Sequence, residues 1–484
     1  MKKVWIAVSI CLLILSYHGV CYGGEDAYGS TEAEIDTGKR ICSPVRLALD
    51  FPQKAVDKML ERKREEIPSP SKLKMSRPAI HGYYFNRNYF NTKSTGDKPN
   101  YELRQDMRLA VSQNIGDQLD YLVSVDGKYH ILHLDYGKFV NTEERFRLWE
   151  CYATYSSGDF NLRVGRQVIR WGKGDEINPT DGFTPEDLTE NLNFFSRAER
   201  KMPALMAKVD YAFEPYRLEA IWLPFFEPSR LPEANSEWEP YLYRYYRSLN
   251  IPINDSGMPN YKLESGVGAI KITRSTESYD VSASYAYHYD ELPAPYLIAL
   301  GTLPPPFSTT LYKVEQKYYR EHTIGSDFEA VVDKFTFRGE FAYTLGKRFL
   351  SYSTLHPDTM VKKDQFFGII GGDYTFPTGN VYLNIQYFTK FIPDHEEDMT
   401  NQSYEDGFLV RISKKFLNDT LLIEADGLIY VYDVDYYYQL KCDYDINDFL
   451  KLMLGYEVYA GELDKTFGQY KKNDHFFAKL KYSF

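Results

Sequence analysis

The most constraining feature of this sequence is the alternation of apolar and charged side chains along many segments of about ten residues. In residues 448–460, Leu450 and Leu452 have one parity, whereas Lys451 and Glu457 have the other. Successive side chains of a β-strand point to opposite faces, so each segment predicts a strand with one apolar and one polar face. Lipid contact requires this separation, because an Arg or Lys facing the bilayer midplane costs roughly 2–4 kcal/mol.

Eighteen segments are strand candidates, and sixteen remain if the weak segments near residues 80 and 319 are not strands. The eighteen are residues 80–90, 100–112, 117–127, 145–157, 159–172, 203–213, 216–226, 264–275, 279–289, 319–332, 334–346, 364–376, 380–391, 404–416, 420–432, 434–445, 448–460 and 473–484. Charges lie on mixed faces in 159–172 and 264–275, so the orientation of these two strands is left open.

The connections between these segments alternate in length. Tight turns such as Glu214-Pro215 and Asn418-Asp419 alternate with long connections such as residues 173–202, 227–263 and 290–318. Short periplasmic turns and long outer loops are typical of outer-membrane barrels. We therefore predict an all-β fold, a transmembrane antiparallel up-and-down β-barrel of 16–18 strands, with 18 preferred. A secreted β-sandwich or propeller is the alternative.

The first 78 residues are expected to lie outside the barrel, which would span residues 79–484. Residues 1–23 resemble a signal peptide, with Lys2 and Lys3 before a short apolar run. Lipidation of Cys21 is the less favoured interpretation. Residues 24–78 are expected to form a periplasmic N-terminal segment with an amphipathic helix over 53–66. This segment either packs beside the barrel mouth or enters the lumen as a short plug.

The composition agrees with a barrel in which only alternate residues face lipid. Aromatic residues make up 16% of the chain, with 43 tyrosines, yet the mean hydropathy is −0.46. Tyrosine suits membrane–water interfaces, because its ring is apolar and its hydroxyl stays hydrated. The net charge of −11 argues against a nucleic-acid partner. Cys42, Cys151 and Cys442 show no CxxC spacing, so neither a metal site nor a disulfide framework is implied. No cofactor is expected.

The polar faces of the strands supply candidates for the lining of a pore. They carry both signs, which would create a transverse field across the lumen. The alternative is that these charges neutralise one another in the wall and select nothing. The pore-lining candidates are Arg104, Asp106, Arg108, Lys208, Asp210, Arg338, Glu340, Asp373, Lys390, Arg411, Glu424, Asp426, Lys451, Glu457, Lys479 and Lys481.

A strand followed by a glycine-rich turn occupies residues 163–188. It contains Gly-Arg-Gln at 165–167, Trp-Gly at 171–172 and Asn-Pro-Thr-Asp at 178–181. With these motifs the chain resembles a large family of uncharacterised, porin-like outer-membrane proteins of Gram-negative bacteria. The terminal Phe484 similarly resembles the assembly signal of such barrels. The resemblance implies a barrel in the bacterial outer membrane and passage of a small molecule, without a defined substrate.

Carboxylates are concentrated in the connection that follows this strand. The constriction-loop candidates are Asp175, Glu176, Asp181, Glu186 and Asp187. If the loop folds inward, these acids would face the lumen arginines and form a charged constriction. Alternatively, the loop caps the barrel or binds divalent cations together with lipopolysaccharide.

Two further features have a functional and a structural interpretation. Aromatic residues in 227–263, including Trp238, could contact sugars or apolar ligands, but packing of the loops is the preferred interpretation. His288, His356 and His395 lie near loops, but no nucleophile-elbow or metalloprotease motif accompanies them. We therefore expect no catalytic residues.

The sequence thus predicts an outer-membrane porin-like channel for diffusion of small solutes. A non-conducting barrel acting as a surface receptor or adhesin is the first alternative, and an outer-membrane hydrolase is the second. The expected partners are outer-membrane lipid and lipopolysaccharide, the barrel-assembly machinery through the C-terminal strand, and a small-molecule solute. Nucleic acid is not expected, and association with further copies of the chain is left open.

Overall fold

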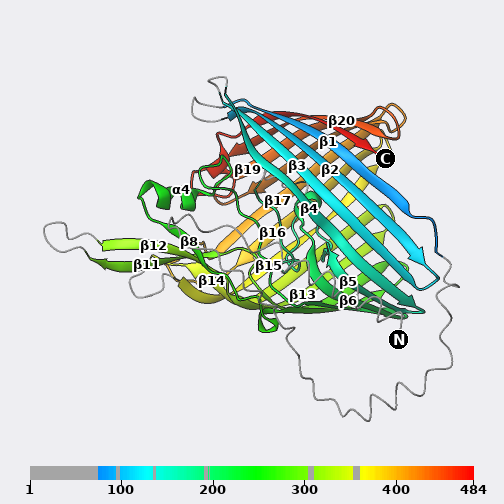
Figure 1. Ribbon diagram of the computed structural model, residues 1–484, viewed down its shortest axis with the longest axis horizontal. Helices are drawn as coiled ribbons and strands as arrows, with labels where there is room; N and C mark the ends of the chain where they lie inside the picture. Colours follow the sequence, from blue (N-terminus) through cyan, green and yellow to red (C-terminus); the bar gives the residue numbers. More distant parts are fainter. Residues whose placement is uncertain are drawn as a thin grey trace, which may run out of the picture.

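Eighteen antiparallel strands form one closed barrel in the computed structural model, which describes residues 75–93, 99–134, 138–189, 195, 197–302, 310–352 and 360–484 (Figure 1). The barrel closes because the first strand pairs with the last as well as with the second. The barrel strands are β1 (Ala79–Asn91), β2 (Pro99–Ile115), β3 (Leu119–Leu134), β4 (Lys138–Ser157), β5 (Phe160–Gln167), β6 (Ala204–Phe213), β7 (Tyr216–Leu223), β9 (Val267–Ser275), β10 (Tyr279–Tyr289), β13 (Arg320–Val332), β14 (Phe335–Leu350), β15 (Met360–Phe376), β16 (Val381–Phe391), β17 (Tyr404–Phe416), β18 (Leu421–Tyr430), β19 (Asp435–Asp445), β20 (Leu450–Ala460) and β21 (His475–Ser483).

The predicted fold class and the preferred strand number are confirmed, and each predicted strand is present. Some boundaries differ. β3 extends to Leu134 rather than residue 127, and β4 begins at Lys138 rather than residue 145. β5 ends at Gln167 rather than residue 172, because the chain there leaves the wall. The predicted signal peptide and the helix over 53–66 lie outside the described residues.

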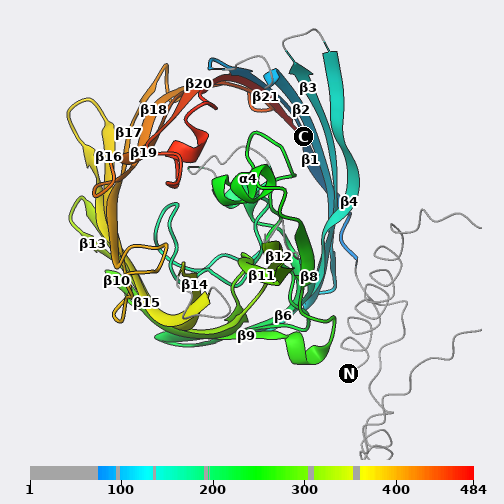
Figure 2. The same cartoon turned by 90° about the vertical axis from the view of Figure 1, so that its left-hand side faces the viewer.

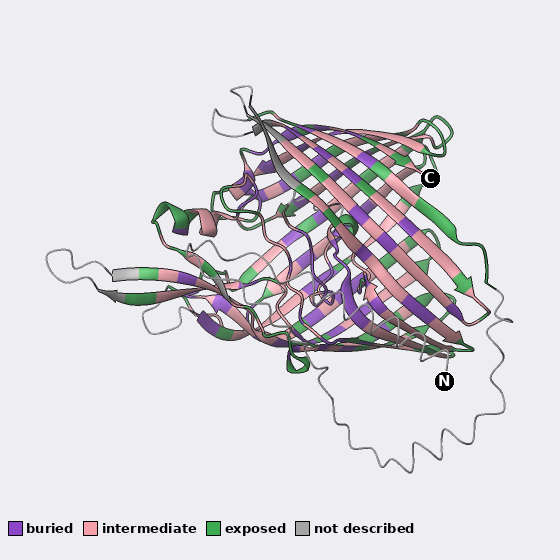
Figure 3. Ribbon diagram, in the orientation of Figure 1, coloured by how far each residue is buried: buried purple, intermediate pink, exposed green. Residues whose placement is uncertain are grey.

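The two faces of the wall separate apolar from charged side chains, as the alternation predicts. On β14, Phe335 and Phe337 are exposed on the outer face, whereas Glu340 is completely buried on the inner face. Exposed and buried positions alternate along the strands in Figure 3. Near one short turn, stacked rings of Phe213 and Tyr216 form an aromatic cluster of the kind found at membrane interfaces.

The structure shows which faces of β5 and β9 point into the barrel, which the sequence left open for the predicted strands 159–172 and 264–275. On β9, Ile270 and Ile272 are exposed outside, and the Lys271 ammonium lies 2.6 Å from the Asp327 carboxylate of β13 inside the barrel. On β5, the buried Gln167 shares its parity with Arg163, so this arginine also belongs to the inner face.

Residues predicted as plain loops contain a second, three-stranded sheet. It consists of β8 (Ile253–Gly257), β11 (Ala294–Thr302) and β12 (Thr310–Lys317), and it projects beyond the barrel at the end that carries the long connections (Figure 1). Among the described residues, the helical elements are α3 (Arg197–Arg200), α4 (Tyr241–Ser248), η3 (Leu263–Ser265) and η4 (Gly468–Tyr470). In the described part of the chain, no helix is long and apolar enough to cross a membrane.

Candidate functional site

The described part of the connection between β5 and β6, residues 168–189, 195 and 197–203, turns into the barrel and will be called the inward loop. Viewed from the end with the long connections, segments of the chain cross the interior of the barrel (Figure 2). Trp171 and Phe183 of the inward loop pack edge-to-face and join a buried cluster with Met206 and Ile221 of the wall. Burial of these rings gives the inward loop an apolar attachment to β6 and β7.

A second attachment is polar and centres on Glu340 of β14. Its carboxylate accepts hydrogen bonds from the backbone N–H (2.7 Å) and hydroxyl (2.8 Å) of Thr180. It also accepts from the backbone N–H groups of Lys173 (3.0 Å) and Gly174 (3.2 Å). Gly172 has a φ of 96°, and a Cβ there would meet this carboxylate. Glycine therefore allows the backbone to approach Glu340 closely.

Two carboxylates of the inward loop meet arginines that project from the wall. Asp175 lies 2.8 Å from Arg338, which also lies 2.7 Å from Asp373. Glu176 lies 3.4 Å from Arg411. Burial raises the pKa of Glu176, and the neighbouring Arg411 opposes that rise.

Arg411 also belongs to a group of charges on the wall itself. Its guanidinium lies 2.6 Å from Asp426 and 3.5 Å from Glu424. Together with the Arg338 contacts, this arrangement ties the inward loop to β14 and β17 by ion pairs.

The next two carboxylates of the inward loop are neutralised within it. The Lys201 ammonium is completely buried and lies 3.2 Å from Asp181 and 3.3 Å from Glu186. Arg197 lies 2.6 Å from Glu186. Burial opposes ionisation of Glu186, but Arg197, Lys201 and Arg200 outweigh it and lower the pKa of Glu186 to about 2. Asp181 and Glu186 therefore hold the loop together rather than facing the lumen arginines.

The fifth carboxylate, Asp187, lies among cations from other elements. Its oxygens approach Arg145 of β4 at 3.2 Å and Arg230 at 3.2 Å. Lys128 of β3 and Arg147 of β4 lie slightly farther away, each at 3.8 Å. Asp187 thus connects the inward loop to β3 and β4.

Between the inward loop and the wall formed by β1–β4 and β21 lies a cavity of about 390 Å³, here called the basic cavity. Five of the pore-lining candidates line it: Arg104, Asp106, Arg108, Lys479 and Lys481. A second cavity of about 310 Å³ shares Phe85, Glu199 and Lys481 with the first. It also includes Lys451 and residues of the short turn before β20. The two cavities are therefore neighbours along the wall.

The remaining pore-lining candidates form ion pairs on the inner wall away from the basic cavity. Lys208 lies 2.6 Å from Glu219 and 3.3 Å from Asp210. Lys390 lies 3.3 Å from Glu405. Glu424 lies 2.6 Å from Lys441, and Glu457 lies 3.3 Å from His475. These contacts agree with the interpretation that many lumen charges neutralise one another.

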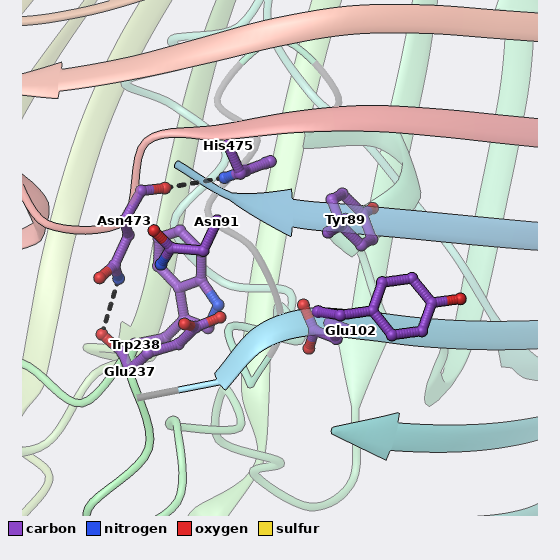
Figure 4. Close-up of a pocket in the computed structure, with 8 residues that line it drawn as sticks. Tyr89, Asn91, Glu102, Glu237, Trp238, Asn473 and His475 are labelled. Atoms are coloured by element: carbon purple, nitrogen blue, oxygen red, sulfur yellow. Dashed lines mark hydrogen bonds between the residues drawn. The ribbon is translucent and has the colours of Figure 1, made fainter. Parts of the chain in front are cut away.

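Trp238 of the connection between β7 and β9 packs against the inner wall rather than facing solvent. It is buried, and its ring contacts those of Tyr459, Tyr470 and His475. Figure 4 shows the adjacent Asn473, whose side chain donates a 2.8 Å hydrogen bond to the Glu237 carbonyl. The space beside these residues measures about 10 Å³, enough for a single water. Trp238 therefore packs this loop in place.

His288 near the end of β10 and His395 in a loop make structural hydrogen bonds. His288 is buried and pairs with the Thr323 hydroxyl at 2.9 Å and the Tyr289 carbonyl at 2.8 Å. His395 pairs with the Asn401 carbonyl at 2.7 Å. His356 lies outside the described residues. Within the described ranges, no group of three His, Cys, Asp or Glu side chains is placed to hold a metal ion.

Several residues of the site were not among the sequence candidates. Arg145 and Arg147 share their parity with Trp149 along β4, so the three side chains lie on the same, inner face. This parity could have identified both arginines from the sequence. Lys201 and Glu291 lie in irregular segments, where no periodicity indicates their direction. The burial of Lys201 and its proximity to the half-buried Glu291 depend on contacts between two connections that are remote in sequence.

The sequence matches the family described as "Protein of unknown function (DUF1302)" over residues 83–357, more than half of the chain. No curated protein matches it. The fold is similar to OccAB1 of Acinetobacter baumannii, with a TM-score of 0.50, 10% identity, and coverage of 86% of this chain and 99% of that chain.

Two further solved structures are similar at lower scores. OccK5 (OpdH) of Pseudomonas aeruginosa has a TM-score of 0.47 and 10% identity, covering 84% of this chain and 96% of that chain. The outer membrane channel DcaP of Acinetobacter baumannii has a TM-score of 0.38 and 12% identity, covering 86% and 99%. The barrel is thus of the porin-like outer-membrane type, and the chain belongs to the uncharacterised DUF1302 family.

Proposed function

We propose that this protein is an outer-membrane channel through which small solutes diffuse, narrowed by the inward loop. Barrels of 16–18 strands enclose an aqueous channel unless something fills it. The observation that carries the proposal is the attachment of the inward loop to β14 through Glu340, which leaves the 390 Å³ basic cavity on the opposite side of the loop. Solutes would pass between the inward loop and the wall of β1–β4 and β21.

Conductance across planar bilayers tests the proposal directly. Purified folded protein should give discrete ionic steps, and liposomes containing it should swell at rates that fall with solute size. Neutralisation of Arg104, Arg108 and Arg338 should shift the reversal potential toward cation preference. The absence of both steps and swelling, from protein with the heat-modifiable migration of a folded barrel, would refute the channel.

A surface receptor is the second candidate, and the projecting sheet of β8, β11 and β12 favours it. Leu300 and Tyr312 are exposed on this sheet, which extends beyond the barrel wall. In that case the protein would be non-conducting in bilayers, and removal of residues 294–317 would abolish adhesion or ligand capture by whole cells.

The proposed location also implies partners. Lipid and lipopolysaccharide would contact the exposed apolar outer face, including Phe337 and Ile385. The barrel-assembly machinery would act on the C-terminal strand β21.

A further inference from the structure

Two lysines of β21 face the basic cavity without a carboxylate partner. Within the described ranges, no carboxylate oxygen lies within 4.0 Å of the ammonium of Lys479 or Lys481. Lys479 is only 9% exposed. A cation this deeply buried normally has a counter-ion, because desolvation of an unpaired charge is costly. Glu457 and Asp443 interact with Lys479 electrostatically but do not contact it, so the side of the ammonium that faces the cavity has room for a further anion.

The contacts that these two lysines do make are with aromatic rings. The Lys479 ammonium lies 4.1 Å from the ring centre of Phe477 and 5.2 Å from that of Tyr89. The Lys481 ammonium lies 4.8 Å from the ring centre of Tyr83. These contacts hold the lysines over rings of β1 and β21 and leave their N–H donors free for an acceptor in the cavity.

Of the carboxylates that line the same cavity, Glu150 accepts a hydrogen bond from the Val168 backbone N–H, and the others contact arginines. Asp106 lies 3.0 Å from Arg87 of β1, and Asp126 lies 3.1 Å from Arg108 of β2. Overall, eight cationic and five anionic side chains line the cavity. The excess of positive charge is thus a property of the whole cavity.

The cavity is also lined by aromatic rings that stack with cationic side chains. The Trp149 ring lies 4.2 Å from the Arg108 guanidinium and 4.3 Å from that of Arg147, and Tyr83, Phe85 and Tyr89 line the β1 side. The volume of about 390 Å³ falls within the range of roughly 300–1,000 Å³ typical of small-molecule sites.

We propose that the basic cavity binds small organic anions with a flat apolar body, such as aromatic carboxylates, through Lys479 and Lys481. The carboxylate would accept hydrogen bonds from both ammonium groups, and the ring would lie among the aromatic side chains of β1 and β4. This proposal rests on the proposed channel, for which the cavity would be a selective step, but binding is measurable without conduction.

Isothermal titration calorimetry of the folded full-length barrel with benzoate tests the proposal. Benzoate should bind saturably, and Lys479→Gln/Lys481→Gln should weaken it by at least about tenfold, because two charge-assisted hydrogen bonds are lost. The matched control is Lys334→Gln/Lys472→Gln, which removes two exposed lysines outside the cavity and should leave affinity unchanged. Unchanged binding in the Lys479/Lys481 variant, or no binding to the wild type, would overturn the proposal.

Three comparison ligands define the chemical class. Benzyl alcohol should not bind, because it lacks the anion, and cyclohexanecarboxylate should bind more weakly, because it lacks the flat ring. Inorganic phosphate binding as tightly as benzoate would overturn the assignment to organic anions. Heat-modifiable migration verifies that each variant is folded, and Lys481→Gln alone serves if the double variant does not fold.

Binding and conduction can fail separately. Ionic steps without benzoate binding would refute this inference and leave the proposed channel intact. Benzoate binding without ionic steps would refute the channel while supporting the anion site.

Discussion

The Glu340 carboxylate of β14 accepts hydrogen bonds from both the backbone N–H and the hydroxyl of Thr180, at 2.7 and 2.8 Å. One residue belongs to the wall and the other to the inward loop. A buried carboxylate that gathers donors in this way fixes the loop backbone to one strand, because each donor would otherwise be left unpaired away from water.

Replacement of Glu340 by alanine should release the inward loop. Losing the charge-assisted bonds should weaken docking of the loop by roughly 3 kcal/mol. We expect a larger and noisier single-channel conductance in planar bilayers. The control is Glu277→Ala in the exposed turn between β9 and β10, which should conduct like the wild type. Equal conductance in the two variants would contradict a role of Glu340 in holding the loop.

Neutralising Asp175 and neutralising Arg338, which form an ion pair, should shift ion selectivity in opposite directions. Asp175→Asn removes a negative charge from the inward loop and should shift the reversal potential toward anions, whereas Arg338→Gln should shift it toward cations. Because the residues are in contact at 2.8 Å, the effects should not add in the double variant. Reversal potentials in a salt gradient measure the ion selectivity of the two single variants and of the double variant. Strict additivity would show that the pair does not act at the narrow part of the channel.

Docking of the inward loop should depend on pH through Glu291. Burial raises the pKa of Glu291 to about 8, with Lys201 and Arg197 opposing the rise and Glu186 and Asp181 reinforcing it. The folded state therefore holds an extra proton between about pH 4.5 and 8, and stability must fall as pH rises through this interval. Amide hydrogen exchange of the inward loop, corrected for intrinsic rates, should accelerate between pH 6 and 8.5.

The control for this dependence is Glu291→Gln, which is neutral at every pH. Its backbone carbonyl still accepts the 3.0 Å hydrogen bond from Ser229, so the local fold should be kept. Exchange in this variant should lose the acceleration between pH 6 and 8.5. A wild type and variant with the same pH profile would place the titrating group elsewhere.

A side chain at Gly82 should weaken the seam that closes the barrel. A Cβ there would meet the Arg108 carbonyl oxygen and lie 3.0 Å from the Phe484 ring, whereas a Cβ at Gly427 of β18 would meet nothing within 4 Å. Gly82→Ala should therefore destabilise the barrel by roughly 1–3 kcal/mol. Gly427→Ala should be nearly neutral. The temperature at which each variant loses its folded migration in detergent gels measures this, and equal temperatures would refute the steric argument.

Local alternation was sufficient to predict the wall of the barrel. Phe335 and Phe337 share one parity along β14, and Glu340 has the other. Once lipid covers one face of the strand, the two phenylalanines must face it, because a charge facing lipid is energetically costly. The same reasoning applies to the other strands separately, except for the predicted strands 159–172 and 264–275, where charges on both faces left the orientation open. Strand ends were less certain: β3 and β4 continue beyond the predicted boundaries, because neighbouring strands provide hydrogen-bond partners that the periodicity does not reveal.

The sequence by itself determined the strands, the faces of all but two of them, and the position of a carboxylate-rich connection. Only the tertiary structure decided which charges meet, because the pairing of Asp175 with Arg338, or of Lys201 with Asp181, depends on the path of the inward loop across the lumen. The sheet of β8, β11 and β12 likewise required two connections to meet in space. The cost of facing lipid depends on the individual side chain, so the sequence reveals it. The charges of the inward loop are neutralised by partners that are remote in the chain, so only the tertiary structure reveals these pairs.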